Sequence, residues 1–569
     1  MLIFYDFEVT KYDWLVVLID PINRMEKVIH NNKTEMERFY LDHKEDIWIG
    51  YNSRSYDQYI LKSILCDFNP YEVSHYIIQE EQKGYTFSRL FNKFPLIGYD
   101  VRTVQTMPGL KTLEGFMGND IRETTVPFDI DRPLTKDELD QMIYYCRHDV
   151  MQTIEVFLNN KNEFDSQMAL VKTFKLPLSH IGKTQAQLAA IILGAKRTEY
   201  DDEWDIQIPD TLELKKYKFV ADWFLNKENH AKDKNLECNI AGVPHVFAWG
   251  GLHGSIDKYQ YTCKPDELLI MADVDQLYPT IMIKYGLLSR CVSDYKKFEH
   301  ILSESLRLKA LKMKKEREPY KRICNITYGA MGDKFNAMYD PLHRTLVCVF
   351  GQLFLLDLIE KLEPVCDLIQ SNTDGILLKI KRKNFERLDD LVYEWEQRTG
   401  LHMSFDCYKK VFQKDVNNYL TVDYDGHMKS KGSYVKGLSR LDYDLPILKK
   451  ALVNYMVNDI PVEKTIKDCN ALIMFQKIVK VSSLYKCGWH NGKQLTDKTF
   501  RVFASTRSSD SYIGKQKKEG ATIEKFANTP EKCFIDNSDI NEKICPDNLD
   551  KQWYIDLAKK RLKDFGIEI

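Results

Sequence analysis

The sequence predicts an α/β protein of several domains. A chain of 569 residues is longer than one hydrophobic core usually supports, so we expect it to divide into domains. Apolar runs typical of strands, at 268–274 and on both sides of a turn at 372–375, are separated by a longer amphipathic stretch typical of a helix, at 296–317. The hydrophobic content of 44% is that of an ordinary globular protein.

Charge and cysteine usage limit the classes of partner. The net charge of −2 makes no global case for nucleic acid, so any DNA path must be a local basic groove. The thirteen cysteines include no Cys-x-x-Cys pair, which favours reduced thiols over a disulfide framework or a zinc module. The N-terminus has no signal-peptide pattern, and no apolar stretch reaches membrane-spanning length. We therefore expect a soluble, cytoplasmic protein without a membrane partner.

Two acidic positions stand at the ends of predicted strands. Asp273 ends an apolar run, and the following Leu277-Tyr278-Pro279 favours a helix start, because proline is tolerated in the first turn. Asp374 lies in a tight turn between two apolar strands, at the tip of a predicted hairpin. Taken alone, Asp273 could equally be the capping acid of a buried strand. Together the two carboxylates could hold paired Mg²⁺ ions about 3.5–4 Å apart for phosphoryl transfer.

A basic helical region separates these two acids. Lys321, Asn325 and Tyr328 are three and four residues apart, so on a helix they share one face. The preceding helix, predicted over 296–317, has a basic side that is usually a solvated face. A turn at Glu318-Pro319 would return the chain as the second helix of an antiparallel pair.

A second set of acids lies in the first 150 residues. Asp6 and Glu8 point to the same side of a predicted strand, because side chains alternate along a strand. Asp57 follows another short strand, while Tyr145 and Asp149 lie one helical turn apart. Each acid alone could be a solvated or capping carboxylate. Together they favour a second metal site.

These patterns match known motifs in order. Asp273 begins Asp-x-x-x-Leu-Tyr-Pro, Lys321 begins Lys-x-x-x-Asn-x-x-Tyr-Gly, and Asp374 ends a motif that is usually Asp-Thr-Asp. The chain thus resembles the family B DNA polymerases, in a compact phage-type form, with Asn372 in place of the first aspartate of the third motif. Upstream, Asp-x-Glu, Asn-x-x-x-Tyr-Asp and Tyr-x-x-x-Asp resemble the DEDD-type 3′-to-5′ exonuclease motifs.

The resemblance implies an RNase H-like exonuclease domain and a right-hand polymerase with palm, fingers and thumb. The boundaries that we expect are residues 1–165 for the exonuclease, 166–289 for connector and palm, 290–331 for fingers, 332–440 for palm and 441–569 for thumb.

The resemblance also implies roles for individual residues, with two Mg²⁺ ions per active site and Mn²⁺ as a substitute. The metal ligands of the synthetic site would be Asp273, Asp374 and the Val274 carbonyl; those of the exonuclease would be Asp6, Glu8, Asp57 and Asp149, with Tyr145 orienting the attacking water and Lys111 as an auxiliary lysine. The nucleotide would contact Tyr278, which resembles a steric gate against ribose, and Arg307 (or Lys309), Lys321, Asn325 and Tyr328. DNA would contact Asn52, Gly250, Gly251, Tyr419 and Lys431.

The function that this resemblance implies is DNA-directed DNA synthesis with proofreading. Primer-template DNA and dNTPs would be the partners of a monomer, with a helicase, single-strand-binding protein or clamp as candidates, in a host-cell cytoplasm if the chain is phage-encoded. Between Pro279 and residue 296, and between Gly329 and Asn372, the chain lacks room for the insertions of protein-primed relatives, so we expect it to extend a nucleic-acid primer during replication. The alternatives are a 3′-to-5′ exonuclease whose polymerase half, weakened by Asn372, mainly binds DNA, and a DNA-binding scaffold with both sites vestigial.

Overall fold

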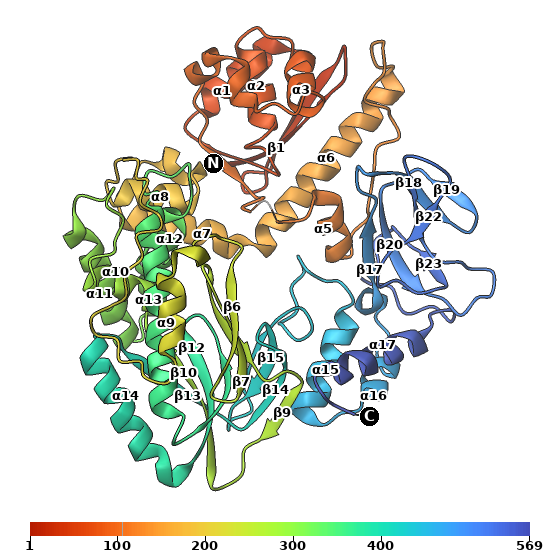
Figure 1. Ribbon diagram of the computed structural model, residues 1–569. Coiled ribbons are helices and arrows are strands. Elements are labelled where there is room, and N and C mark those ends of the chain that lie inside the picture. Colours follow the sequence, from red (N-terminus) through yellow and green to blue (C-terminus); the bar gives the residue numbers. More distant parts are fainter. Residues whose placement is uncertain (105, 569) are drawn as a thin grey trace. The chain divides into compact units, whose positions relative to one another are not determined.

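The computed structural model describes residues 1–104 and 106–568 and confirms the mixed α/β class (Figure 1). The chain forms two compact units. Unit 1 comprises Met1–Lys183, Leu438–Ile447 and Lys467–Tyr554, and unit 2 comprises Thr184–Gly437, Leu448–Ile466 and Ile555–Ile569. This grouping does not test the boundaries of the five predicted segments, which stay predictions.

Unit 1 is built on a five-stranded sheet in the order β3-β2-β1-β4-β5. Strand β1 pairs antiparallel with β2, which pairs antiparallel with β3, whereas β4 and β5 run parallel to β1. The strands are β1 (Leu2–Val9), β2 (Trp14–Asp20), β3 (Met25–His30), β4 (Ile47–Gly50) and β5 (Gly98–Asp100). The helices are α1 (Lys33–His43), α2 (Asp57–Leu65), α3 (Pro70–Ile78), α4 (Gly84–Phe87), α5 (Leu110–Met117), α6 (Lys136–Asn159) and α7 (Lys161–Thr173).

The two faces of this sheet carry separate cores. Tyr5 and Phe7 pack in a cluster with α1, α2 and α3, whereas Phe4 packs in a cluster with α5, α6 and α7. Because side chains alternate along a strand, Asp6 and Glu8 share the Phe4 face and point toward the side covered by α6. Helix α6 begins at a capping box, in which Thr135 and Glu138 each bind the other's backbone N–H.

The C-terminal part of unit 1 is a pair of small sheets fastened to α5 by a buried arginine. One sheet has the order β17-β20-β23 and the other β19-β18-β21-β22. Arg501 on β20 is fully buried and donates to the carbonyls of Gly115, at 3.2 Å, and Asn119, at 2.7 Å. The strands of these two sheets are β17 (Lys477–Lys480), β18 (Tyr485–His490), β19 (Lys493–Leu495), β20 (Thr499–Ala504), β21 (Gly514–Lys517), β22 (Ile523–Lys525) and β23 (Cys533–Ile535). Since a buried charge is costly unless its hydrogen bonds are satisfied, these contacts fix the two segments together.

Unit 2 is built on a seven-stranded antiparallel sheet in the order β13-β10-β12-β11-β8-β7-β6. Its strands are β6 (Asn235–Ile240), β7 (Val243–Ala248), β8 (Gly251–Ser255), β10 (Glu267–Val274), β11 (Asp367–Ser371), β12 (Gly375–Lys381) and β13 (Met403–Tyr408). A second sheet, β16-β15-β14-β9, consists of β9 (Tyr259–Thr262), β14 (Lys410–Asp415), β15 (Asn418–Val422) and β16 (Met428–Lys431). Strands β10 and β12, the centre of the predicted acidic site, are neighbours in the large sheet.

Helix α13 (Pro341–Leu362) is the central helix of unit 2. It is buried over most of its length, as expected for a helix that is apolar all round. The other helices are α8 (Gln185–Ile192), α9 (Lys218–Leu225), α10 (Leu277–Lys284), α11 (Tyr295–Ala310), α12 (Lys314–Met331) and α14 (Phe385–Thr399). Helices α15 (Pro446–Asn458), α16 (Val462–Lys467) and α17 (Lys551–Lys563) belong to this unit for most of their length.

Helices α11 and α12 form the expected antiparallel pair, side by side in Figure 1, but the turn between them is earlier than predicted. Helix α11 ends at Ala310, and Pro319 lies inside α12. The reason is a C-terminal cap: Lys312 has φ +57°, and the Met313 N–H donates to the Leu308 carbonyl at 3.0 Å. Pro319 is tolerated because it is close to the start of α12 and costs only one helical hydrogen bond.

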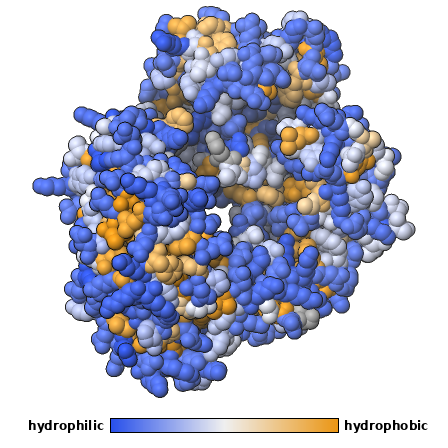
Figure 2. All heavy atoms as spheres, viewed as in Figure 1, coloured by the Kyte–Doolittle hydropathy of each residue, from blue (hydrophilic) through white to orange (hydrophobic). Residues whose placement is uncertain are grey.

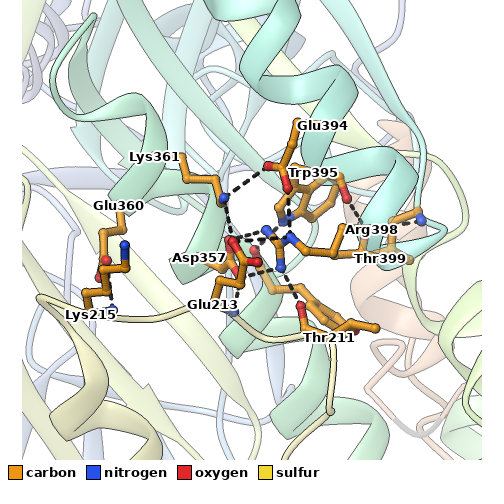
Figure 3. A network of polar contacts seen from close by, with 12 residues as sticks. Thr211, Glu213, Lys215, Asp357, Glu360, Lys361, Glu394, Trp395, Arg398 and Thr399 are labelled. Atoms are coloured by element: carbon orange, nitrogen blue, oxygen red, sulfur yellow. Dashed lines mark hydrogen bonds and ion pairs between the residues drawn. The ribbon is translucent and has the colours of Figure 1, made fainter.

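A buried ion-pair network joins α13, α14 and the segment at 211–217 (Figure 3). Asp357 on α13 is fully buried and accepts two hydrogen bonds from the Arg398 guanidinium, at 2.8 and 2.9 Å. It also accepts from the Glu213 N–H at 2.7 Å, and Lys361 pairs with both Glu213 and Glu394 at 3.0 Å. The bidentate geometry and the full set of partners compensate for burying the charges.

Among the helices within 1–104 and 106–568, none is both long enough and apolar enough to cross a lipid bilayer. On the face shown in Figure 2, hydrophilic residues predominate and hydrophobic residues form small patches. This is the distribution expected when most large apolar side chains are buried in cores.

Candidate active sites

The structure brings the four predicted exonuclease acids close enough to interact around β1 of the unit 1 sheet. Asp6 and Glu8 come from β1, Asp57 from the first residue of α2, and Asp149 from α6. The Phe7 N–H donates to the Asp57 carboxylate at 3.1 Å, which fixes the start of α2 against β1. Glu8, Asp57 and Asp149 are 9%, 3% and 8% exposed, so this is a nearly buried acidic cluster.

The sequence did not point to three further groups in this cluster. The Cys146 thiol lies 3.7 Å from an Asp6 carboxylate oxygen, and ligand atoms of Asp6, Glu8 and Cys146 all lie within 4.8 Å of one another. Glu114 is fully buried and, with His148 and Asp149, forms a second set within the same limit. Glu114 comes from α5, a helix distant in sequence and without any acidic motif of its own.

Lys111 is the cation of this site. Its ammonium group binds Asp149 and lies 3.0 Å from Glu114. It also lies 4.5 Å from the centre of the Tyr145 ring. Burial alone would lower the pKa of Lys111, but Asp149 and Glu114 outweigh it and raise the pKa. The lysine therefore stays charged and compensates part of the negative charge.

The carboxylates still carry more negative charge than the site can hold without cations. Burial raises the pKa of Asp6 and of Glu8 well above the usual range, and the neighbouring acids raise both further. Burial also raises the pKa of Asp57 to about 7 and that of Asp149 to about 6, in the latter case against the opposing charge of Lys111. Oxygen ligands arranged in this way are the donor set that Mg²⁺ prefers, so these residues fit such an ion.

In unit 2, Asp273 and Asp374 lie at adjoining strand ends. Asp273 on β10 is paired with Gly375 on β12, and the Val274 N–H donates to the Asp374 carbonyl at 2.7 Å. Asn372 and Gly375 close the turn through a backbone bond of 2.8 Å. A Cβ atom on Gly375 would lie 2.1 Å from the Asp273 carboxylate, so only glycine leaves room here for the Asp273 side chain. The pair of carboxylates and the backbone oxygens nearby also fit Mg²⁺.

Lys429 on β16 is a further cation that sequence reasoning missed. Its ammonium group lies 3.7 Å from Asp273 and 3.5 Å from Asp406. Burial raises the pKa of Asp273; Lys429 opposes this shift, and Asp374 adds to it. The pairing of β15 with β16 could have suggested that Lys429 lies near the acids. Lys429 is paired with Thr421, and Thr421 is two residues after Tyr419.

A pocket of about 310 Å³ opens beside these acids. It is lined by Val274, Gln276, Leu277, Tyr278, Pro279, Arg317, Lys321, Asn325, Thr373 and Asp374. Lys321 and Asn325 point into it from one face of α12, as their spacing predicts. The volume is at the lower end of the range for small-molecule sites.

Arg307, predicted to bind the nucleotide, does not line this pocket. Its guanidinium pairs with Glu304 at 2.8 Å on the exposed side of α11. Arg317 lines the pocket in its place, one helical turn before Lys321. Arg317 reaches the pocket because α11 ends early, at Ala310, so that Arg317 belongs to α12 rather than to the first helix. Lys309, the predicted alternate, instead binds Asp275.

The two predicted tyrosines of the pocket contact each other. The ring centres of Tyr278 and Tyr328 lie 4.3 Å apart. The Tyr278 hydroxyl lies 3.9 Å from the Cys348 thiol on α13, and a Cβ atom on Gly351 would lie 3.0 Å from the Tyr278 ring. Helix α13 therefore supports the Tyr278 ring from below and sets how far it projects toward the pocket.

The predicted DNA-binding residues differ in their surroundings. Gly251, with φ +141°, approaches Thr373 of the acidic hairpin, whereas Gly250 has open space around it. Tyr419 is only 8% exposed and packs in a core cluster with Met271 and Tyr408, so its ring does not present a free surface. Lys431 is exposed on β16 beside Tyr419, and Asn52 in unit 1 accepts a hydrogen bond from Arg102 at 3.3 Å.

Comparison with known proteins finds distant likeness. No family model matches the chain, and no curated protein matches it. Among solved structures, the family B DNA polymerase from the hyperthermophilic archaeon Pyrobaculum calidifontis is similar at a TM-score of 0.42 and 14% sequence identity, over 100% of this chain and 78% of that chain. The residues of the two acidic sites are therefore the basis for assigning a function to this chain.

Proposed function

We propose that this chain is a DNA-directed DNA polymerase with a 3′-to-5′ proofreading exonuclease. One observation carries the proposal: Asp374 lines the same pocket as Tyr278, Lys321 and Asn325, and the next residue, Gly375, pairs with Asp273 in the sheet. Two acids beside a cationic pocket suit a triphosphate substrate whose negative charge must be held while its phosphoryl group is transferred.

In the synthetic site, Asp273, Asp374 and the Val274 carbonyl would hold Mg²⁺. When bound, paired Mg²⁺ ions would activate the attacking oxygen of the primer and stabilise the leaving oxygen. Lys321 and Arg317, four residues apart on α12, would hold the triphosphate by charge and by hydrogen bonds. This positioning brings the α-phosphate to the acids and is itself a large part of catalysis.

The aromatic wall of the pocket would select the sugar. The Tyr278 ring, supported by α13 and by Tyr328, would occupy the space of a ribose 2′-hydroxyl. Asn325 would donate and accept hydrogen bonds at the same wall. Selection of this kind works by exclusion, because a rigid ring cannot move aside without losing its packing.

In the exonuclease site, Asp6, Glu8, Asp57 and Asp149 would hold the metal ions. The Tyr145 hydroxyl would orient the water that attacks the terminal phosphodiester, and Lys111 would stabilise negative charge next to it. The strand order β3-β2-β1-β4-β5, antiparallel and then parallel, supports an RNase H-like fold for this half.

The proposed architecture follows the same resemblance. The sheet that contains β10 and β12 would be the palm, the α11–α12 pair would be short fingers, and the C-terminal region would be the thumb. A phage-type replicative enzyme that extends a nucleic-acid primer fits this compact arrangement.

Incubation of the purified protein with a labelled primer-template in Mg²⁺, with and without dNTPs, tests both activities. We expect extension with dNTPs and shortening from the 3′ end without them. Shortening without any extension would favour the alternative, an exonuclease whose second half only binds DNA, for which Asn372 is the motivating residue. Neither activity in Mg²⁺ or Mn²⁺ would overturn the proposal.

A further inference from the structure

Asp275, two residues after the catalytic Asp273, is turned away from the pocket. Its carboxylate accepts a hydrogen bond from the Ser404 hydroxyl at 3.1 Å and binds the ammonium group of Lys309 on α11. Its backbone N–H donates to the His402 carbonyl at 2.7 Å. The side chain is therefore held at a fixed place between β13 and α11.

The next residue makes a second link to the same helix. Gln276 has φ +52° and ψ +47°, a conformation that is costly for a residue with a side chain. Its amide donates to the Ser305 hydroxyl on α11 at 2.7 Å. The Ser305 carbonyl in turn accepts from the Arg317 guanidinium at 3.1 Å, so the contact continues to a residue that lines the pocket.

On this side, α11 borders a groove of about 640 Å³, with Ile283 on α10 and Leu302 and Leu306 on α11 in its wall. Asp275 and Lys309 also line this groove. Elsewhere the helix packs on α12, and Phe298, Ile301 and Leu308 are buried. At the start of α11, the Tyr295 hydroxyl donates to the Leu288 carbonyl at 2.8 Å. The Asp275–Lys309 contact therefore bridges the groove near the other end of the helix.

We propose that Asp275 and Lys309 form a latch that fastens α11 to the strand carrying Asp273. The latch is a positioning device: neither side chain lines the pocket, but together they fix α11, and through it the α12 residues that hold the nucleotide. Asp275 is thereby a positioning residue rather than a metal ligand. The kinetic consequence drawn below rests on the proposed polymerase function.

The expected effect is on nucleotide binding rather than on chemistry. Without the latch, α11 and α12 move away from the strand that carries Asp273 more often, and dNTP binding must return them to their position. Because Lys309 is 37% exposed and the pair is partly screened, we expect Lys309→Met to raise KM for dNTP about three- to tenfold. At saturating dNTP, kcat should change less than about twofold, since the bound complex restores the geometry.

A double-mutant cycle isolates the pair. Lys309→Met, Asp275→Ala and the double variant are compared in single-nucleotide incorporation, with Lys309→Arg as the conservative variant and Lys297→Met as the control, an exposed lysine at the start of the same helix. We expect the double variant to be no worse than the worse single variant, and Lys309→Arg to be close to wild type. Additive losses, or an equal loss in Lys297→Met, would overturn the latch.

Hydrogen exchange of the intact protein without DNA tests the latch independently of activity. We expect faster amide exchange within 295–310 in Lys309→Met and Asp275→Ala, and no change in Lys297→Met. Unchanged exchange in both latch variants would overturn the latch even if the protein is an active polymerase. Faster exchange in a protein that extends no primer would support the latch and overturn the proposed function.

Discussion

The acidic sites of units 1 and 2 use the same ligand type in opposite environments. In unit 1, Glu8, Asp57 and Asp149 are nearly buried, and Lys111 among them has only 14% of its side chain exposed. In unit 2, Asp374 lines a pocket, and Asp273 beside it has 40% of its side chain exposed. The buried site concentrates acidic groups before any substrate arrives, so protons or cations must neutralise part of their charge even at rest. In the proposed polymerase, the phosphates of the substrate would complete the open site.

This difference predicts distinct sensitivities. A buried carboxylate cluster should link metal binding to folding stability, because the ions relieve repulsion within the core. An open pair should link metal binding to catalysis and affect folding little. Each of the following experiments changes either the buried site of unit 1 or the open site of unit 2.

The largest effect is expected at Asp273. Asp273→Ala removes a proposed metal ligand and should slow primer extension at least about a thousandfold, equal to about 4 kcal/mol of activation free energy. Single-turnover incorporation measures the loss. Asp266→Ala, an exposed acid just before the same strand, is the matched control and should extend like wild type. An Asp273→Ala enzyme within tenfold of wild type would remove this acid from the site.

The next effect concerns sugar selection. Tyr278→Val should raise ribonucleotide incorporation relative to deoxyribonucleotide incorporation by about ten- to a thousandfold, or about 1.4–4 kcal/mol of lost discrimination. Competing incorporation of rNTP and dNTP opposite the same template base measures it, with Tyr393→Val on the exposed side of α14 as the control. Unchanged selectivity would show that another residue excludes the ribose 2′-hydroxyl.

The metal-free stability of unit 1 should fall as pH rises from about 4 to about 7. The pKa of Asp57 is raised to about 7 and that of Asp149 to about 6, whereas unfolded aspartate titrates near 3.9. In this window the folded state binds more protons than the unfolded state, so the free energy of unfolding decreases with pH.

Thermal unfolding in EDTA checks this sign. We expect the thermal midpoint of Asp57→Asn to decrease less with pH than that of the wild type. At pH values above 7, adding Mg²⁺ should raise the wild-type midpoint more than the midpoint of the variant. Asp42→Asn, an exposed acid on α1, should behave as wild type. A metal-free midpoint that rises with pH across this window would contradict the buried-charge interpretation.

The smallest effect is expected at Lys429. This lysine is 53% exposed and partly compensates Asp273, so its loss should make the open site more attractive to cations. We expect Lys429→Met to lower the Mg²⁺ concentration for half-maximal extension about two- to fivefold. A Mg²⁺ titration measures this, with the exposed Lys383→Met as the control. A higher Mg²⁺ requirement would assign Lys429 to another task, such as holding the primer.

Local sequence patterns predicted the parts of both sites that depend on local geometry. Strand alternation predicted the common side of Asp6 and Glu8, the tight turn predicted the hairpin tip at Asp374, and helical spacing predicted the shared face of Lys321 and Asn325. Each of these relations is set within a few residues of chain.

Relations between distant segments were not predictable from the same patterns. Glu114 and Lys429 join the acidic sites through sheet and helix packing that no motif records. The Glu318-Pro319 pair predicts a later turn, with Arg307 as the nucleotide ligand, whereas the αL cap at Lys312 ends the first helix earlier and Arg317 lines the pocket. A proline near the start of a helix and a proline in a turn give the same local signal.

The reciprocal separation of the two activities on one labelled primer-template tests the central claim most directly. The account predicts that Asp273→Ala shortens the primer but never extends it, and that Asp6→Ala combined with Glu8→Ala extends the primer but no longer shortens it. Loss of both activities in either variant, or shortening retained by the double variant, would contradict two separate sites in this chain.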